Sequence, residues 1–191
     1  MKPLLVRFAG GATGQWRIDR LDAVLGDPLP PAARLAVLDD PDASPREASS
    51  WVLRGVTSNE RYANQTERAA LLMRQQGLGR KEATCAALIP IRKSETWWEL
   101  TQDERREIFE ERSRHIATGL HYLPAVARRL HHGRDLGEPF DFLTWFEYAP
   151  DHAEAFEELV VRLRQTAEWS YVEREVDIRL VREPEPQLSR H

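Results

Sequence analysis

Residues 114–148 read RHIATGLHYLPAVARRLHHGRDLGEPFDFLTWFEY, and the rest of the chain is organised around this stretch. Its beginning places His115 on the same predicted helical stripe as Ile108, Phe109 and Ile116. Arg128 follows His115 by thirteen positions, inside VARRLHH. The stretch ends in FDFLTWFEY, an apolar run typical of a strand. It therefore combines an imidazole, a permanently charged guanidinium and a strand within a short length of chain.

The order and spacing of these features resemble the chlorite dismutase family. Members of that family carry a haem-ligating histidine, an arginine thirteen residues later in a Lys/Arg-rich segment that ends in His, and a strand similar to DFLTWFE. The segments RGVTSNERY, IRKSETWW and TAEWSYV extend the resemblance over residues 51–182. The resemblance implies a haem b enzyme (iron protoporphyrin IX) that decomposes chlorite to chloride and dioxygen.

The composition is that of a globular protein without a nucleic-acid partner. The chain has 191 residues and 41% apolar content, enough for one large domain or two small ones. A net charge of −4 with interspersed charges provides no basic field that concentrates phosphates. The first residues lack the apolar core of a signal peptide, and no apolar run approaches the length of about 20 residues that spans a membrane. We expect a cytoplasmic protein without a membrane partner.

The first half of the chain predicts strands around one helix. Residues 62–77 favour the helix, with Asn64 as its cap and Gly77 at its end. GGATG lacks the lysine of a phosphate loop and predicts a hairpin turn between the first two strands. The predicted strands cover residues 4–11, 14–18, 34–40, 51–58 and 83–93.

The second half repeats the order of strand, helix and strand, preceded by a longer helical segment. A helix over residues 101–115 opens with Thr101 and Glu104 at the spacing of a capping box, and helical structure ends before Pro124. LPAVARRLHH then favours a short helix. A strand over 140–148, a helix over 149–165 and a closing strand over 171–181 complete the prediction.

Two successive strand–helix–strand halves predict an α+β fold in which ferredoxin-like modules join into one barrel. We assign residues 1–92 to a truncated ferredoxin-like module, 93–183 to a haem-binding ferredoxin-like module, and 184–191 to a flexible tail. The weaker first half resembles the short lineage of the family, and this resemblance implies a homodimer, a dimeric α/β barrel.

The resemblance identifies His115 as the axial ligand of the haem iron. Glu168, in TAEWS, resembles the carboxylate that accepts the proton of the proximal imidazole and fixes its tautomer. Without these spacings His115 would more simply be a core histidine, and Glu168 an ordinary glutamate at a helix end. The remaining histidines have no such partner, and we expect His131 and His132 to be solvated or capping groups near a helix end.

Two short motifs resemble the haem edge of the family. In KSETWW, Trp97 and Trp98 follow Lys93 by four and five positions, and TSNERY contains Asn59 and Tyr62. A lysine with indole and phenol donors suits the propionates of a haem. The alternative for the tryptophan pair is plain hydrophobic anchoring.

Arg128 is the residue that points to a particular reaction. An arginine is permanently charged and cannot shuttle protons at neutral pH, so it suits an anion better than a peroxide. The resemblance implies that chlorite binds ferric iron opposite His115, that Cl–O cleavage gives an oxo-iron species and hypochlorite retained by Arg128, and that their recombination forms dioxygen. Leu130, Thr144 and Phe146 resemble the rest of the distal wall. The alternative for Arg128 is an exposed arginine on a basic helix end.

Three other functions compete with this interpretation. A coproheme decarboxylase of the same superfamily has a neutral, glutamine-like residue in place of Arg128 and a longer amino-terminal module. A haem peroxidase is expected to use a distal histidine or carboxylate, and none matches the distal face, so any peroxidase activity should be weak. A non-enzymatic haem sensor or carrier would use the barrel only to hold the cofactor.

Overall fold

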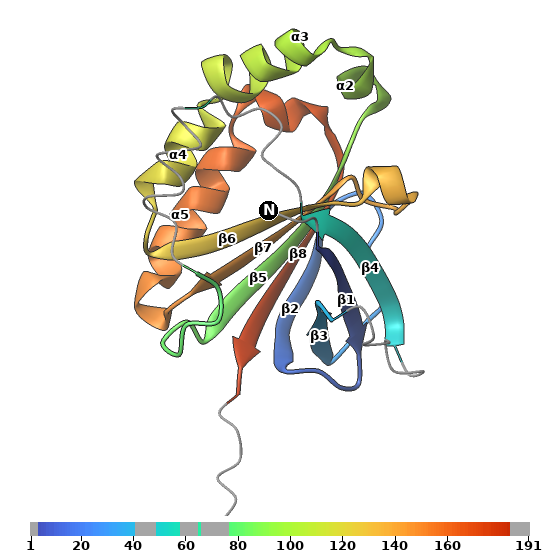
Figure 1. The fold of residues 1–191 in the computed structure, drawn as a ribbon, viewed down its shortest axis with the longest axis vertical. Helices are drawn as coiled ribbons and strands as arrows, with labels where there is room; N and C mark the ends of the chain where they lie inside the picture. Colours follow the sequence, from blue (N-terminus) through green and yellow to red (C-terminus); the bar gives the residue numbers. More distant parts are fainter. Residues whose placement is uncertain (1–3, 41–48, 58–64, 66–76, 184–191) are drawn as a thin grey trace, which may run out of the picture.

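The computed structural model describes residues 4–40, 49–57, 65 and 77–183. Among these residues, eight strands close into a barrel in the order β1-β3-β2-β8-β5-β7-β6-β4. Helices α4 and α5 lie on one side of the barrel, and α2 and α3 lie beyond its end (Figure 1). The mixed α/β fold expected from the sequence is therefore confirmed.

All paired strands of the barrel are antiparallel. Residues along each strand alternate between the barrel interior and its outer face, because side chains of a strand point to opposite sides in turn. The strands are β1 (Leu5–Gly11), β2 (Trp16–Leu25), β3 (Arg34–Leu38), β4 (Ser49–Thr57), β5 (Cys85–Lys93), β6 (Val126–His132), β7 (Phe142–Tyr148) and β8 (Val172–Arg182).

The helical segments follow β5, β6 and β7 in the chain. They are α2 (Glu95–Glu99), α3 (Gln102–Arg106), the π-helical turn η1 (Glu107–Arg112), α4 (His115–His121), α5 (Ala153–Arg164), and the 3-10 turns η2 (Arg134–Leu136), η3 (Pro150–His152) and η4 (Ala167–Tyr171). The helix predicted over 62–77 lies almost entirely outside the described residues, as does the tail 184–191. No helix in the described ranges has the length and apolarity needed to cross a bilayer.

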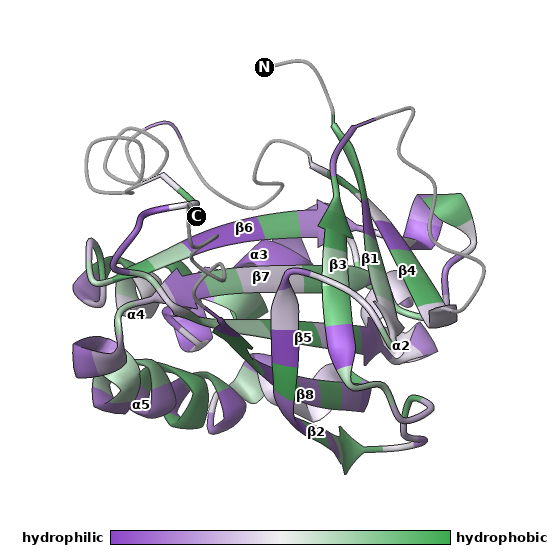
Figure 2. Ribbon diagram, turned by 90° about the horizontal axis from the view of Figure 1, so that it is seen from below, coloured by the Kyte–Doolittle hydropathy of each residue, from purple (hydrophilic) through white to green (hydrophobic). Residues whose placement is uncertain are grey.

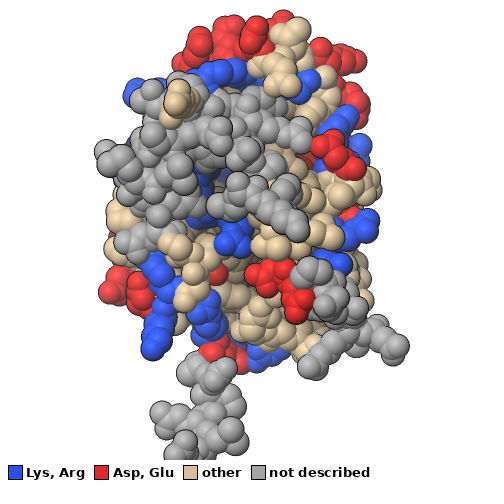
Figure 3. Space-filling view, viewed as in Figure 1, with Lys and Arg blue, Asp and Glu red and all other residues tan. Residues whose placement is uncertain are grey.

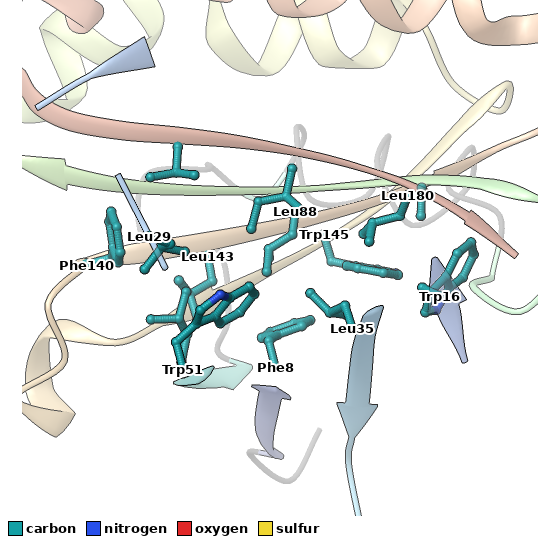
Figure 4. Close-up of a cluster of buried hydrophobic side chains, with 14 of the residues drawn as sticks. Phe8, Trp16, Leu29, Leu35, Trp51, Leu88, Phe140, Leu143, Trp145 and Leu180 are labelled. Atoms are coloured by element: carbon teal, nitrogen blue, oxygen red, sulfur yellow. The ribbon is translucent and has the colours of Figure 1, made fainter. Parts of the chain in front are cut away.

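The barrel interior is filled by large apolar side chains from both halves of the chain. Figure 4 shows Phe8, Leu35, Trp145 and Leu180 meeting inside the barrel from four different strands. The rings of Phe8 and Trp145 stack with centroids 5.7 Å apart. Truncating one such aromatic side chain to alanine typically removes about 3–5 kcal/mol of stability. This interior gives the sheet a rigid frame.

A second apolar cluster lies between the outer face of the sheet and α5. The helix buries Phe156, Leu159, Val160 and Leu163 at the spacing predicted from the sequence. Its other face is mostly hydrophilic apart from the exposed Val161 (Figure 2). Phe156 stacks on Tyr148 of β7 with ring centroids 4.4 Å apart. The outer face of β5 and β7 is therefore covered by helices, which gives function-bearing side chains on that face a sheltered position.

Charged groups are unevenly spread over the surface. Acidic side chains gather at the end of the molecule formed by α3 and η1, as Figure 3 shows in the orientation of Figure 1. Basic side chains are visible nearer the middle of the same face (Figure 3).

The predicted hairpin between β1 and β2 is wrong, because β3 lies between these two strands. The glycine-rich segment instead crosses close to β3. Gly14 has φ 153°, and a Cβ atom on it would lie 2.3 Å from the carbonyl oxygen of Leu35. Only glycine fits this approach, so the segment is a crossing point rather than a tight turn.

The short helix predicted for LPAVARRLHH is also wrong, since residues 126–132 form β6. Its Ala, Arg and Leu residues favour helix, but pairing with β7 outweighs this weak preference. His131 and His132 are consequently buried rather than solvated. The Nδ1 atom of His131 lies 3.0 Å from the carbonyl oxygen of Leu143, and burial lowers the pKa of His131 to about 4.

The substitution Gly14→Ala tests the crossing of β3. We expect it to lower the free energy of unfolding by about 2 kcal/mol or more, because the new methyl group would overlap the Leu35 backbone at a strained φ. Gly77→Ala is the matched control, since a Cβ at Gly77 meets no atom within 4 Å. Urea unfolding measures both, and equal stabilities would contradict the close approach.

Candidate functional site

The helical segment that carries His115 is interrupted immediately before the histidine. The predicted capping box of Thr101 and Glu104 is present, and α3 runs from it into the π-helical turn η1. Arg114 then adopts a left-handed conformation with φ 51°. The predicted single helix over 101–115 is thus broken, and His115 is the first residue of a separate helix, α4. π-helical turns are rare and frequently lie at functional sites.

Two residues of η1 fix the start of α4. The carboxylate of Glu110 accepts hydrogen bonds from the backbone N–H groups of Ile116 and Ala117, at 2.7 and 3.3 Å. The ring of Phe109 stacks on the imidazole of His115, with centroids 4.3 Å apart and planes inclined by 20°. The backbone and one face of the imidazole are therefore both held.

The carboxylate of Glu168 joins His115 to Lys93. Its Oε2 lies 2.7 Å from Nδ1 of His115, and its Oε1 accepts from Nζ of Lys93 at 2.8 Å. The backbone N–H of Glu168 donates to Oγ of Ser113 at 3.0 Å. Glu168 and Lys93 are 3% and 1% exposed, so this pair is shielded from water. We call His115, Glu168 and Lys93 the Glu168 network.

The electrostatics of the Glu168 network keep its carboxylate ionised. Burial alone would raise the pKa of Glu168, but the adjacent His115 and Lys93 outweigh it and lower that pKa to about 2. Burial lowers the pKa of Lys93, and the Glu168 carboxylate opposes this shift. An ionised Glu168 can only accept, so Nδ1 of His115 is the donor in their hydrogen bond. In the neutral imidazole the lone pair is then on Nε2, the atom that can bind a metal.

The sequence predicts a propionate contact for Lys93, and the structure shows its ammonium group beside Glu168. The expectation placed its ammonium group at the haem edge with Trp97 and Trp98. In the structure the ammonium contacts the side chain and the carbonyl oxygen of Glu168, and lies 4.6 Å from the ring centroid of Trp97. Lys93 therefore belongs to the support of the imidazole.

Trp98 has the donor that the sequence predicted for a rim carboxylate. Its ring stacks on Phe142 with centroids 6.0 Å apart, and the guanidinium carbons of Arg134 and Arg105 lie 4.1 and 5.2 Å from the ring centroid. Its indole N–H is buried and has no hydrogen-bond partner among the described residues. A buried donor of this kind typically destabilises a protein by about 1–3 kcal/mol unless something accepts from it. Asn59 and Tyr62 lie outside the described residues.

The predicted distal residues share one face of the sheet. Arg128 is paired with Phe146 and Leu130 with Thr144 across β6 and β7, so all four side chains point to the same side. This is the outer face, because Phe146 packs against Phe156 of α5. The strand, rather than the predicted helix, thus positions Arg128.

Helix α4 brings His115 and Arg128 to the same region. Gly119 lies one helical turn after His115, and a Cβ atom on it would be 3.9 Å from the guanidinium carbon of Arg128. The guanidinium therefore reaches the helix that begins with the imidazole. The structure brings together His115, Glu168 and Lys93 by direct contact, and Arg128 with them by way of α4.

Sequence reasoning missed three supporting residues: Phe109 as a stacking partner, Glu110 and Ser113. Each lies within six positions of His115, but they act through the π-helical turn and the left-handed Arg114. A regular helix over 101–115 would point them in other directions, so no spacing rule identifies them.

These residues fit an iron porphyrin in three respects. The Nε2 of His115 is available as a base, the buried indole N–H of Trp98 lacks an acceptor, and Arg128 supplies a fixed positive charge from the sheet. A haem requires an axial base and hydrogen-bond donors for its propionates. An anionic ligand of the iron would require the positive charge.

Comparison with known proteins agrees with this fit. The family model for chlorite dismutase matches residues 44–183. The chain is 34% identical over 86 residues to a chlorite dismutase from Ideonella dechloratans, a match that covers 45% of this chain and 28% of that protein. The match therefore spans less than a third of the length of this relative.

Solved structures resemble the whole fold. The crystal structure of dimeric chlorite dismutases from Nitrobacter winogradskyi is 59% identical in sequence, covers 93% of this chain and 99% of that one, and has a TM-score of 0.87. A mutant chlorite dismutase from Candidatus Nitrospira defluvii in complex with cyanide is 20% identical, covers 95% and 91%, and has a TM-score of 0.68. The second likeness concerns the fold alone.

The pKa of Glu168 predicts an acid-sensitive contribution to stability. Its pKa falls from an ordinary 4.5 to about 2 on folding, so the stabilisation is present above pH 4.5 and disappears as the pH falls through 2. In the ligand-free protein, the free energy of unfolding should decrease between pH 5 and pH 2 by about 3 kcal/mol more than in Glu168→Gln.

Urea unfolding at several pH values measures this difference. Glu111→Gln, an exposed change in η1, is the control and should keep the acid sensitivity of the unsubstituted protein. Identical pH profiles for the unsubstituted protein and Glu168→Gln would show that the carboxylate is not paired as described.

Proposed function

Because the chain belongs to the chlorite dismutase family, we propose that it binds haem b through His115 and converts chlorite to chloride and dioxygen. The observation that carries this proposal is the hydrogen bond from Nδ1 of His115 to the buried, ionised Glu168. A histidine held in this way presents Nε2 as a strongly basic ligand. The bound haem would supply the iron centre at which the Cl–O bond breaks and the O–O bond forms.

The Glu168 network would hold the proximal side. Glu168 keeps the proton on Nδ1 and fixes the orientation of the imidazole. Lys93 neutralises the buried carboxylate, and without that partner the isolated charge would be strongly destabilising. Glu168 and Lys93 would therefore act on the basicity of His115, and His115 alone would bind the iron.

The edge of the haem would lie beside Trp98. Its unpartnered indole N–H suits a propionate oxygen, and the guanidinium groups of Arg105 and Arg134 are close to the same ring. We assign Trp97, Asn59 and Tyr62 to the same edge by resemblance to the family. These assignments place the propionates at the α2 end of the site.

Arg128 would hold the anions on the distal side. Its charge is permanent, so chlorite and the hypochlorite fragment are both attracted to it at neutral pH. At 4 Å and an effective dielectric constant near 20, this attraction is about 4 kcal/mol. Leu130, Thr144 and Phe146 share its face of the sheet and would limit the access of water. The fragment would thus stay close enough to react again.

We also propose the module division, with a truncated first module and a haem-binding second one. The strand order β8-β5-β7-β6, with α5 packed on one face, supports a ferredoxin-like second module. Since β5 (Cys85–Lys93) pairs with β7 and β8, we place the start of that module at β5 rather than at residue 93. The dimeric relative supports a homodimer. A cytoplasmic location stays a prediction.

Substituting His115 tests the ligand assignment. His115→Ala should abolish stable haem uptake, because the side chain that supplies Nε2 is removed. Haem titration followed by visible absorption measures this. His121→Ala is the control, since His121 is exposed on the same helix and should leave uptake unchanged. A full haem spectrum in His115→Ala would show that a residue other than His115 binds the iron.

Substituting Arg128 tests the distal role. Arg128→Ala should still bind haem, but it should yield less oxygen per chlorite and bleach sooner, because hypochlorite escapes. An oxygen electrode and the decay of the haem absorption measure the two effects. Arg129→Ala is the control, because Arg129 points to the other side of β6. An unchanged oxygen yield and an unchanged rate of haem bleaching would show that Arg128 has no part in the reaction.

The purified, haem-loaded protein separates the proposed function from its alternatives. Oxygen evolution on addition of chlorite supports a chlorite dismutase. Decarboxylation of added iron coproporphyrin without oxygen evolution would identify a decarboxylase, and turnover of hydrogen peroxide alone would identify a peroxidase. Haem binding without any of these activities would identify a sensor or carrier.

A further inference from the structure

We propose that Trp169, anchored by Glu175, is a positioning residue for the Glu168 network. It touches neither the iron nor the substrate, and acts through Glu168, which precedes it in the chain. The effect on haem rests on the proposed function, whereas the positioning of Glu168 is a property of the ligand-free chain. Neither Trp169 nor Glu175 has a part in the site described above.

The side chain of Trp169 connects the Glu168 network to Glu175 of strand β8. The indole N–H of Trp169 donates to Oε2 of Glu175 at 2.9 Å. The ring of the same tryptophan lies with its centroid 5.7 Å from Nζ of Lys93, within the range of a cation–π contact. Trp169 therefore contacts the cation that pairs with Glu168 and, at its other end, a residue of β8.

Glu175 is a rigid anchor. It is 1% exposed, and its Oε1 accepts from Nε and Nη2 of Arg164 at 2.8 and 2.5 Å. Arg164 also donates to Oδ2 of Asp177 at 2.7 Å. A buried carboxylate with these partners cannot turn without leaving charges unpaired, which is strongly unfavourable. Its Oε2 therefore presents a fixed acceptor to the indole.

Glu168 lies in a short turn whose orientation depends on contacts with other elements. It lies in η4, a 3-10 turn of five residues, and hydrogen bonds in 3-10 turns have poorer geometry than those of an α-helix. Ser113 accepts from the N–H of Glu168 on one side, and Trp169 ties the next residue to β8 on the other. Lys93 Nζ also donates to the carbonyl oxygen of Glu168 at 3.3 Å, and the N–H of Ser94 donates to the carbonyl oxygen of Tyr171 at 2.8 Å. Among these bonds, that of the Trp169 indole holds the residue next to Glu168 and so helps to aim the carboxylate at His115.

The consequence concerns the basicity of the imidazole. If the indole bond is lost, η4 can turn and the bond between Glu168 and His115 lengthens. A weaker acceptor leaves less negative charge on the imidazole, which then stabilises oxidised iron less. The reduction potential of the bound haem should therefore rise. If Trp169 acted only through the packing of its ring, replacing it by phenylalanine would leave the potential unchanged, because a phenyl ring retains that packing.

The substitution Trp169→Phe removes the indole N–H and keeps an aromatic ring. In the ligand-free protein, hydrogen exchange at the backbone N–H of Glu168, followed by NMR, should accelerate by about tenfold because η4 opens more often. In the haem-loaded protein, the midpoint potential should shift upward, and the dissociation constant of haem should rise by up to about tenfold.

Trp51→Phe is the matched control. Trp51 also donates its indole N–H to an oxygen, the carbonyl of Pro30, at 3.0 Å, but it does so in the barrel cluster and away from η4. It should lose a similar amount of stability and change neither the exchange at Glu168 nor the potential. Glu175→Gln leaves one amide oxygen for the donors of both Arg164 and Trp169, so the bond to the indole should weaken. It should lower the melting temperature and shift the potential upward, in the same direction as Trp169→Phe.

The hydrogen-exchange measurement and the potential measurement test the proposal independently of each other. Unchanged exchange at Glu168 in Trp169→Phe overturns the proposal whether or not haem binds. Equal potentials in Trp169→Phe and Trp51→Phe overturn the effect on the imidazole. If the unsubstituted protein takes up no haem, the proposed function fails, and the exchange measurement still decides whether Trp169 positions Glu168.

Discussion

The pairing of one buried carboxylate with an imidazole and an ammonium group is the constraint on which the site depends. Glu168 is almost entirely removed from water, and an ionised carboxylate in that position persists only if both of its oxygens are paired. His115 and Lys93 provide the two partners from different parts of the chain. The end of β5, the start of α4 and the turn η4 must therefore meet at one point, and the surrounding structure is arranged around that meeting.

The barrel and the helices contribute in different ways. The packed interior fixes the strands, so that Lys93 at the end of β5 and Arg128 on β6 have defined positions. The interruption at Arg114 frees His115 from the preceding helix and lets the imidazole face Glu168. A rigid sheet thus supplies the charged residues, and an irregular helical segment supplies the nitrogen that is proposed to bind the metal. The two sides of the proposed haem site are chemically unequal for this reason.

The sequence predicted the parts that depend on local patterns. Apart from β6 and the second half of β2, the strands appear where short apolar runs are bounded by glycine or proline. Helix α5 appears where Phe156, Leu159 and Val160 keep helical spacing. The contact between His115 and Glu168 was also expected, although only through resemblance to a family.

The remaining features depend on contacts between distant residues. Residues 126–132 have the composition of a helix, and only the edge of β7 makes them a strand. Lys93 ends β5 and resembles a lysine at a haem edge, but its direction is decided by Glu168, far along the chain. The left-handed conformation of Arg114 could not be predicted, because this position holds an arginine rather than a glycine. The insertion of β3 between β1 and β2 likewise follows from pairing rather than from the turn.

A crystal structure of the haem-loaded protein would show which residues face the two sides of the porphyrin. We predict that Nε2 of His115 binds the iron while Nδ1 stays bonded to Glu168, and that the guanidinium of Arg128 lies on the opposite side of the porphyrin. Iron bound to any other side chain, or Arg128 on the same side as His115, would contradict it.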